Sequence, residues 1–302
     1  MEQSWKRAKA IFAIILGPPL AWLLLFFLIP LTIVWVFSFG TNVGLTEIAF
    51  TGTFSNYARA IEPLYVGIFL KSVGVAGLTT LLCLIVGFPV ALAITFAPDR
   101  LKAWLILLVM LPFWTNLLIR TYALIAVLRT EGYVNLSLGW LWTHASGLMT
   151  MVGLSPLTRF EPLELLHNNF AVVFGLVYVH LPFMVLPLYS ALDRLDRSLL
   201  EASLDLGAGH FRTMMMVVVP LALPGIASGI LITFIPALGA YLTPDLLGGP
   251  DSQMIANIIE SQLLKQRDQA LGSALSVTVM LIVAVVSGIF LLLNRRFLRG
   301  QK

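Results

Sequence analysis

Long apolar runs alternate with short polar segments along almost the whole chain. Crossing a bilayer as a helix takes about 20 consecutive apolar residues, and six runs in this sequence are long enough. They predict helices over about 11–39, 67–97, 103–125, 170–192, 214–241 and 272–294. Nearly all contain an internal proline, such as Pro30, Pro89, Pro112, Pro182, Pro187 and Pro236. Because lipid offers no partner to the backbone groups that proline frees, these breaks favour an irregular, packed bundle.

The first apolar run follows a basic stretch and continues for almost thirty residues without a charge. A cleaved signal peptide would have a shorter apolar region and a cleavage site of small residues. We therefore predict that this run is retained as the first membrane span.

The composition agrees with an all-α integral membrane protein of six transmembrane helices. Hydrophobic residues make up 59% of the chain, charged residues only 11%, and the mean hydropathy is +0.93, whereas soluble domains carry roughly a quarter charged residues. The net charge of +4 does not indicate nucleic-acid binding, because no basic stripe with interleaved aromatic residues exists. The lone cysteine, Cys83, lies inside an apolar run, so we expect a buried hydrophobe and no disulfide or metal cluster.

The distribution of Lys and Arg predicts the orientation, because cytoplasmic loops carry an excess of both. With the N-terminus inside, the inner side holds twelve of the nineteen, namely Lys6, Arg7, Lys9, Arg100, Lys102, Arg194, Arg197, Arg212, Arg295, Arg296, Arg299 and Lys302. The outer segments and their flanks hold Arg59, Lys71, Arg120, Arg129, Arg159, Lys265 and Arg267. We therefore expect both termini to be cytoplasmic.

The central parts of the six runs contain no Asp, Glu, Lys or Arg, and their one imidazole is His180. Ion-driven carriers usually place ionisable groups at mid-depth, so the driving energy is expected to be handled elsewhere. For His180, a packing role and a pathway role both remain open. The chain has no nucleophile–base constellation and no G-x-x-x-x-G-K-[ST] loop for phosphates. We expect no catalytic residue, no bound metal and no cofactor on this chain.

The segment "EASLDLGAGHFRTMMMVVVPLALPG" (201–225) begins as a polar stretch between two apolar runs. Ser198 and Glu201 have the spacing of a capping box, and Gly207 suits the left-handed position that ends a helix. These signals predict a short helix over Leu199–Leu206. Spacing of three and four residues places Leu199, Ala202, Ser203 and Leu206 on one face. That face either rests on the protein's own bundle or docks on a partner.

The longer spacing is more specific. From Glu201 the chain reads Glu-Ala-Ser, three residues, Gly207, nine residues, and then a segment that ends at Pro220. This string resembles the EAA loop of the inner-membrane permeases of bacterial ABC importers, which reads E-A-A, three residues, G, nine residues, I-x-L-P. The departures are Ser203 for alanine, Val217 for isoleucine and Val219 for leucine.

The resemblance implies a type I ABC importer permease fold in the bacterial inner membrane. It also implies a second homologous permease, two copies of a cytoplasmic ATPase that uses ATP and Mg, and an extracytoplasmic solute-binding protein. The loop, over about 198–220, would dock on the ATPase through Ser198, Leu199, Glu201, Ala202, Ser203, Leu206, Gly207 and Pro220. Whether Glu201 caps its own helix, pairs with the ATPase, or exchanges between the two stays open.

Three further blocks resemble the spermidine/putrescine permease group, namely "LLIRTYAL" (117–124), residues 175–208 and "FIPALGAYLTPDLLGG" (234–249). This resemblance implies a polyamine or related amine-bearing solute; opines, amino-acid derivatives or peptides remain alternatives, as does a self-sufficient carrier or channel. Two features depart from the group: Asp268 is followed by Gln-Ala in place of Trp-Pro, and the loop 129–169 is longer. Its part "WLWTHASGLMTMVGL" (140–154) is an amphipathic segment at the outer surface or a contact for a binding protein.

We expect an N-terminal part over 1–66, a transport core over 67–294 and a basic tail over 295–302. The solute path is expected near the end of the fifth run, at Pro236, Gly239, Tyr241, Thr243 and Asp245. Pro236 and Gly239 would open the helix toward a cavity, Tyr241 would offer a ring face to a cation, and Asp245 a negative charge. The alternative is a tight turn capped by Asp245. Small residues expected at close helix contacts, within the bundle or with a second permease, are Gly74, Gly77, Gly87, Gly225 and Gly229.

Overall fold

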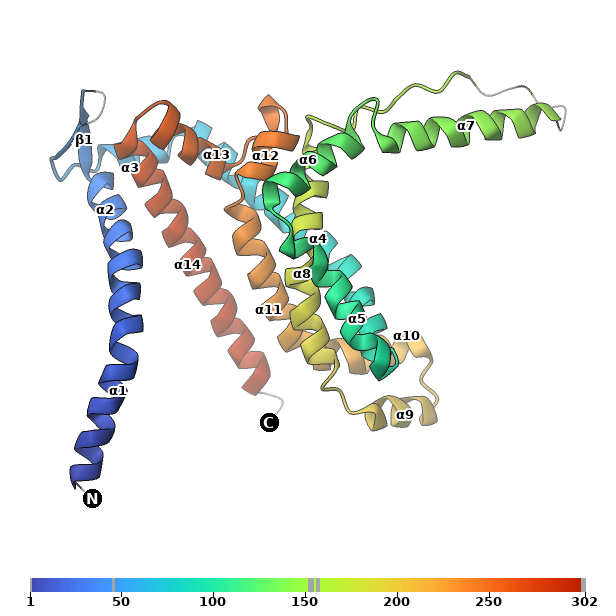
Figure 1. Ribbon diagram of the computed structural model, residues 1–302, viewed down its shortest axis with the longest axis horizontal. Coiled ribbons are helices and arrows are strands. Elements are labelled where there is room, and N and C mark those ends of the chain that lie inside the picture. Colours follow the sequence, from blue (N-terminus) through green and yellow to red (C-terminus); the bar gives the residue numbers. More distant parts are fainter. Residues whose placement is uncertain (1, 45–46, 152–154, 156–157, 300–302) are drawn as a thin grey trace. The chain divides into compact units, whose positions relative to one another are not determined.

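A computed structural model describes residues 2–44, 47–151, 155 and 158–299, and these are mostly helical (Figure 1). Among the described residues, five helices are long and apolar enough to cross a membrane, namely Ile11–Ser38, Pro63–Phe96, Asn169–Leu192, His210–Leu238 and Gln269–Leu292. They correspond to five of the six predicted runs. Lys302 and residues 152–154 of the long loop lie outside the described residues.

The remaining predicted run, 103–125, is two helices rather than one. α5 (Asp99–Met110) leads into a 3-10 turn over Leu111–Trp114, and α6 (Leu117–Leu128) follows. Asn116 lies in extended conformation between them, and its side chain caps α6 by accepting the Leu118 N–H at 2.8 Å. Pro112 in the 3-10 turn has no N–H to donate to the preceding helix. The helices on the two sides of this break meet at 94°.

The helix contacts divide the chain into two compact units, the first formed by Met1–Val66 and Ile258–Val285. α1 (Glu2–Leu23) and α2 (Ile29–Ser38) are joined by a π-helical turn over Leu24–Leu28. β1 (Gly40–Val43) and β2 (Glu47–Phe50) pair antiparallel, and α3 (Ser55–Ala60) follows. This hairpin was not predicted by the all-α interpretation, since each strand is only four residues long.

Asp268 holds the first unit together at the start of α14 (Gln269–Arg299). One carboxylate oxygen accepts from Asn42 Nδ2 at 2.8 Å and from the Leu271 N–H at 3.0 Å, and the other accepts from Arg59 Nη2 at 2.8 Å. Partial burial alone would raise the pKa of Asp268, but these donors outweigh it and hold that pKa below its ordinary value. The carboxylate therefore links β1, α3 and α14.

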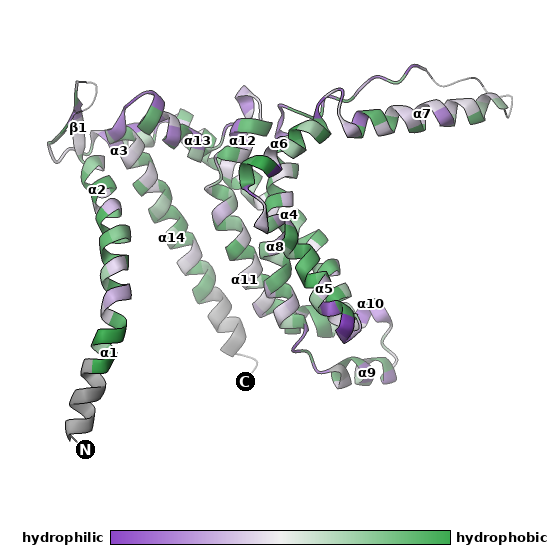
Figure 2. Ribbon diagram, in the orientation of Figure 1, coloured by the Kyte–Doolittle hydropathy of each residue, from purple (hydrophilic) through white to green (hydrophobic). Residues whose placement is uncertain are grey.

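The second unit, Gly67–Asn257 with Val286–Lys302, is centred on α8 (Asn169–Leu192). α4 (Pro63–Phe96) and α11 (Val219–Leu238) both pack on α8, and hydrophobic residues dominate all three (Figure 2). A Cβ added at Gly225 would collide with Ala191, and one at Gly229 would lie 2.7 Å from Met184 Sδ. These glycines therefore allow the close approach of α11 to α8 within the chain. The shorter helices of this unit include α7 (Tyr133–Met151), α9 (Arg197–Asp205), α10 (His210–Thr213), α12 (Leu242–Leu247) and part of α13 (Ile255–Glu260).

Candidate functional site

The short helix predicted between the fourth and fifth spans is α9, but it begins differently from the prediction. It covers Arg197–Asp205, and its N-cap is Asp196, whose Oδ1 accepts the Ser198 N–H at 3.0 Å. This hydrogen bond lowers the pKa of Asp196. The predicted capping box of Ser198 with Glu201 is therefore wrong, because an acidic residue two positions earlier already satisfies the first free N–H. Glu201 is exposed to solvent.

The end of α9 agrees with the prediction. Gly207 has a φ of +82°, in the left-handed region. The Gly207 N–H donates to the Leu204 carbonyl at 2.9 Å, and the Ala208 N–H donates to the Ser203 carbonyl at 3.1 Å. This pair of bonds is the Schellman arrangement that ends many helices. An added Cβ would meet no atom within 4 Å, so glycine is required here by backbone conformation alone.

Beyond the turn, the chain continues through α10, a π-helical turn over Met214–Val218 and then α11. The Val219 N–H donates to the Met214 carbonyl, the longer reach of a π turn. Pro220, the last motif residue, stands at the start of α11, where it has no N–H to continue the regular pattern. The Ser203 and Thr213 hydroxyls lie 3.0 Å apart and join α9 to α10.

The two sides of α9 lie in different environments, and the predicted face, which did not include Leu200, is divided between them. Leu200 packs against the hydrophobic core that includes Val218 and Leu192, and Ser203 is half-buried beside Thr213. Leu199 and Ala202 are exposed, and 88% of Leu206 is exposed. The helix therefore rests on its own bundle through one side and presents an apolar edge on the other.

The surface on which α9 packs is formed by three helices, α4, α5 and α8. A cavity of about 230 Å³ is lined by Leu200 together with residues from the end of α4, the start of α5 and the end of α8. At its edge, Lys102 Nζ lies 3.0 Å from Asp193 Oδ1 and 3.5 Å from Asp99 Oδ1. Lys102 therefore ties the first turn of α5 to the end of α8, directly beside the side chain through which α9 packs.

The residues predicted for the solute path lie around the end of α11. Pro236 and Gly239 are exposed, but α11 stays helical through Pro236 and ends at Leu238. The Gly239 N–H still donates to the Ile235 carbonyl at 3.2 Å. The expected opening of the helix at these two residues is therefore not seen; the helix simply ends there.

The segment after α11 is neither an open loop nor an Asp245-capped turn, but the short helix α12. Asp245 is in its first turn and exposed, as is the ring of Tyr241, whose carbonyl accepts from Asn257 Nδ2 at 2.8 Å. Thr243 is buried, and its Cγ2 would lie 2.8 Å from a Cβ placed on Gly175 of α8. Thr243 therefore helps to seat α12 on α8, while Tyr241 and Asp245 face away from the packing.

His180 lies inside the bundle. It is buried, and its Nδ1 is 2.8 Å from the Leu176 carbonyl oxygen one turn earlier on α8. Its ring centroid is 6.1 Å from that of Phe183. These contacts fit the packing role for His180.

Arg120 was counted among the outer cations, but only 7% of it is exposed. Its Nη2 donates to the Thr115 carbonyl at 3.1 Å across the break before α6, and its guanidinium lies 5.9 Å from the centroid of the Tyr178 ring. Its Nε and Nη1 have no hydrogen-bond partner among the described residues. The sequence placed Arg120 near the end of an apolar run, but the break that buries it was not foreseen.

An exposed, apolar-edged helix that ends at a left-handed glycine and precedes a span is the arrangement expected of the EAA loop. Residues 6–299 match the model of a family described as the binding-protein-dependent transport system inner membrane component. The chain belongs to this family. It is a multi-pass permease subunit of the inner membrane.

Curated relatives match along nearly the whole chain. The spermidine/putrescine transport system permease protein PotB of Salmonella typhimurium (strain SL1344) is 37% identical over 98% of this chain and 95% of its own length. PotB of Escherichia coli (strain K12) is 38% identical over 91% of this chain and 93% of its own. A solved bacterial alginate ABC transporter, in complex with an alginate pentasaccharide-bound periplasmic protein, has a chain that matches over 97% of this one with a TM-score of 0.69. At 16% identity, that match shows the shared importer permease fold.

Proposed function

We propose that this permease subunit imports a polyamine, such as spermidine or putrescine, in a complex driven by ATP. The substrate class is supported by the PotB relatives, which are 37–38% identical over at least 91% of this chain. In this proposal both termini and α9 face the cytoplasm, in agreement with the excess of Lys and Arg in those segments.

The observation that carries the proposal is the exposed edge of α9. Burial of the Leu206 side chain would stabilise the protein, but this side chain is almost fully exposed to solvent, at the end of a well-capped helix. We assign this edge, with Leu199, Ala202 and Glu201, to a groove on a cytoplasmic ATPase. Two copies of that ATPase would hydrolyse ATP with Mg, and movement would reach the spans through Leu200 and the Ser203–Thr213 contact.

We also propose a second, different permease and a solute-binding protein as partners. Two glycines of α4, Gly74 and Gly77, have nothing within 4 Å of an added Cβ, in contrast to Gly225 and Gly229. They leave a face of α4 that a second permease can approach closely. The solute would leave its binding protein near Tyr241 and Asp245, whose ring and carboxylate suit a cationic amine.

Reconstitution tests the proposal. The chain would be purified alone and with its second permease and ATPase, and each preparation placed in proteoliposomes. We expect ATP hydrolysis and spermidine uptake only from the complete complex with its binding protein, and no ATPase activity above background from the chain alone. Uptake by the chain alone, driven by an ion gradient and insensitive to ATP, would contradict the ATP-driven complex. A complete complex that shows ATP-driven uptake of another solute but not of polyamines would contradict only the proposed substrate class.

A further inference from the structure

The long loop between α6 and α8 forms a hairpin of unequal halves. α7 goes out, and a segment without regular structure returns over 158–168. The two halves are joined by specific contacts: Asn135 exchanges hydrogen bonds with the Leu163 backbone, both at 2.9 Å, and Trp142 Nε1 donates to the Thr158 carbonyl at 2.7 Å. An added Cβ at Gly139 would touch the Phe160 ring at 3.3 Å. One side of α7 is therefore covered by the return segment.

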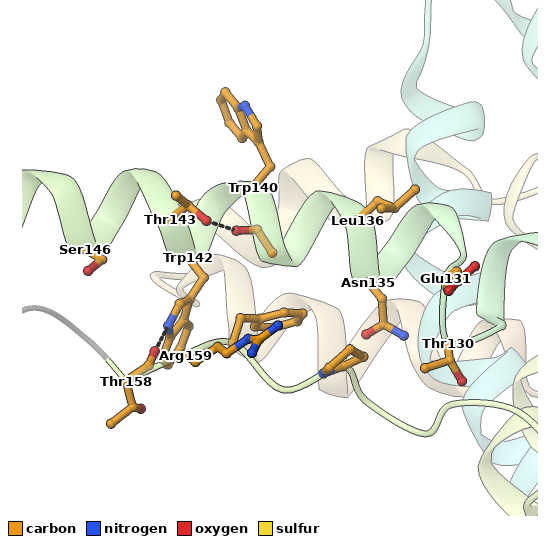
Figure 3. A pocket seen from close by; sticks show the side chains of 13 residues that line it. Thr130, Glu131, Asn135, Leu136, Trp140, Trp142, Thr143, Ser146, Thr158 and Arg159 are labelled. Carbon is orange, nitrogen blue, oxygen red and sulfur yellow. Dashed lines mark hydrogen bonds between the residues drawn. The ribbon is translucent and has the colours of Figure 1, made fainter.

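Figure 3 shows the division at close range: Asn135 and Trp142 point to the return segment, whereas Leu136 and Trp140 project from α7 in another direction. A cavity of about 620 Å³ between the two halves is lined by residues that include Glu131, Trp142 and Arg159. The lining is mixed: polar groups such as those of Glu131 and Arg159 lie beside the rings of Trp142 and Phe160.

The side of α7 away from the return segment is largely apolar and uncovered; Ser137 and His144 are its polar members, and the centroid of the His144 ring lies 4.0 Å from that of Trp140. Residues spaced by seven and eleven along a helix fall on one face, and here these are Tyr133, Trp140 and Met151, with Leu148 beside them. Of these side chains, 61% of Trp140, 65% of Leu148 and 86% of Met151 are exposed. The 19 residues of α7 include no Asp, Glu, Lys or Arg. An apolar face of this length on a protein surface marks an interaction site.

Charge is confined to the other half of the hairpin. Arg159, Glu161 and Glu164 of the return segment are all exposed. In Figure 1, the return segment runs on the side of α7 away from α4, α5 and α8. The charged half therefore faces away from the membrane-crossing helices, and the uncharged face of α7 turns toward the level at which they emerge.

The break between α5 and α6 determines the direction in which this hairpin extends. The helices over Leu117–Met151 turn 94° from Asp99–Trp114. Where α5 runs across the bilayer, the segment Leu117–Met151, of which α7 is the longer part, therefore runs close to the plane of its surface. An amphipathic helix in that plane buries its apolar face at the boundary of headgroups and acyl chains, and Trp and Tyr are enriched there.

We infer that α7 lies flat in the outer membrane interface, with Tyr133, Trp140, Leu148 and Met151 in contact with phospholipid and the return segment in water. The occupant of this face is lipid rather than a binding protein, because α7 contains no Asp, Glu, Lys or Arg and is joined through α6 to the membrane-crossing helix α5. The hairpin would then hold a fixed position at the outer membrane surface, beside the outer ends of α6 and α8.

Spin labels in proteoliposomes test this assignment. Cys83 is the only cysteine, so Cys83→Ala provides a background for single cysteines at Leu148, Met151 and Glu161, all of which are exposed. The permease complex would be reconstituted in phosphatidylethanolamine and phosphatidylglycerol. Collision of each label with oxygen, which concentrates in lipid, would be compared with collision with a water-soluble nickel chelate. Only variants that retain uptake would be compared.

We expect labels at Leu148→Cys and Met151→Cys to collide more with oxygen, and the label at Glu161→Cys to collide more with nickel. Higher collision with nickel at both α7 positions would overturn the inference. If that nickel access then disappears on addition of the binding protein, the face is a protein docking site. Low collision with both reagents, without binding protein, would place the face against another protein segment and would also overturn it.

Discussion

The hydroxyl of Ser203 lies 3.0 Å from the hydroxyl of Thr213, across the turn that contains Gly207. Ser203 occupies the third motif position, where the family pattern has alanine, and Thr213 is buried at the end of α10. The pair therefore adds a side-chain link between α9 and the fifth span that an alanine at this position cannot make.

This link predicts a measurable coupling between the two residues. Ser203→Ala and Thr213→Val each remove one hydroxyl, and a double-mutant cycle on thermal unfolding should give an interaction of about 1 kcal/mol. Ser203→Ala alone restores the family's alanine, so uptake should fall little. Additive effects would mean that Leu200, rather than the hydroxyl pair, attaches α9 to the bundle.

The N-cap of α9 predicts an asymmetry between neighbours. Asp196→Ala removes the acceptor of the Ser198 N–H, so hydrogen exchange over the first turn of α9 should accelerate several-fold. Ser198→Ala leaves that acceptor in place and should change exchange little. If exchange instead accelerated more in Ser198→Ala than in Asp196→Ala, that result would support the capping box of Ser198 with Glu201.

Substitutions of Asp268 should lower stability by amounts that depend on which of its contacts are lost. Asp268→Asn loses the ion pair with Arg59 but can still cap α14, so it should cost no more than about 1 kcal/mol. Asp268→Ala loses the cap as well and should cost about 1–2 kcal/mol in total.

The sign of the pH effect follows from the lowered pKa. A carboxyl whose folded pKa lies below its ordinary 3.8 stabilises the folded state above that value, and the contribution is lost as pH falls through the folded pKa. Melting curves of wild type and Asp268→Asn should therefore converge in strong acid and differ at neutral pH. A gap that widened on acidification would contradict the hydrogen-bonded carboxylate.

The proposed solute path predicts different effects for two changes at one position. Tyr241→Ala removes the ring and should raise the KM for spermidine uptake roughly two- to fivefold, the worth of one exposed cation–π contact. Tyr241→Phe keeps the ring face and should change KM little. Asp245→Asn should also raise KM. Unchanged kinetics in both Tyr241→Ala and Asp245→Asn would remove these residues from the path.

The sequence was informative wherever a local physical rule decided the structure. Apolar length located the spans, and Gly207 was identifiable because only glycine adopts a φ of +82° without strain. The spacing from Glu201 to Pro220 pointed to the family before any geometry was known. The third run was predicted as one helix with Pro112 inside it, and its break, with a turn of 94°, needed the structure.

Features that depend on contacts between distant segments were not predictable. Asp268 draws together Asn42 and Arg59, more than 200 positions earlier, and no periodicity records such a cluster. Burial of Arg120 depends on how α6 meets α8 after the break. The end of α11 at Leu238 and the close contact of α12 with Gly175 of α8 likewise needed the structure.

We propose that α9 and its turn dock on an ATPase and transmit movement, and substitutions at Gly207 test this role most directly. Valine there would be forced into the left-handed region at a cost of roughly 1–2 kcal/mol, with no clash, since nothing lies within 4 Å. Asparagine tolerates that region and is the matched control.

The measurement is ATPase co-purification together with spermidine uptake in membranes that contain equal amounts of each variant. Gly207→Val should insert normally, retain less ATPase and lose uptake, whereas Gly207→Asn should stay close to wild type in both. If Gly207→Val keeps its ATPase and its uptake, α9 is an interfacial helix with no part in coupling.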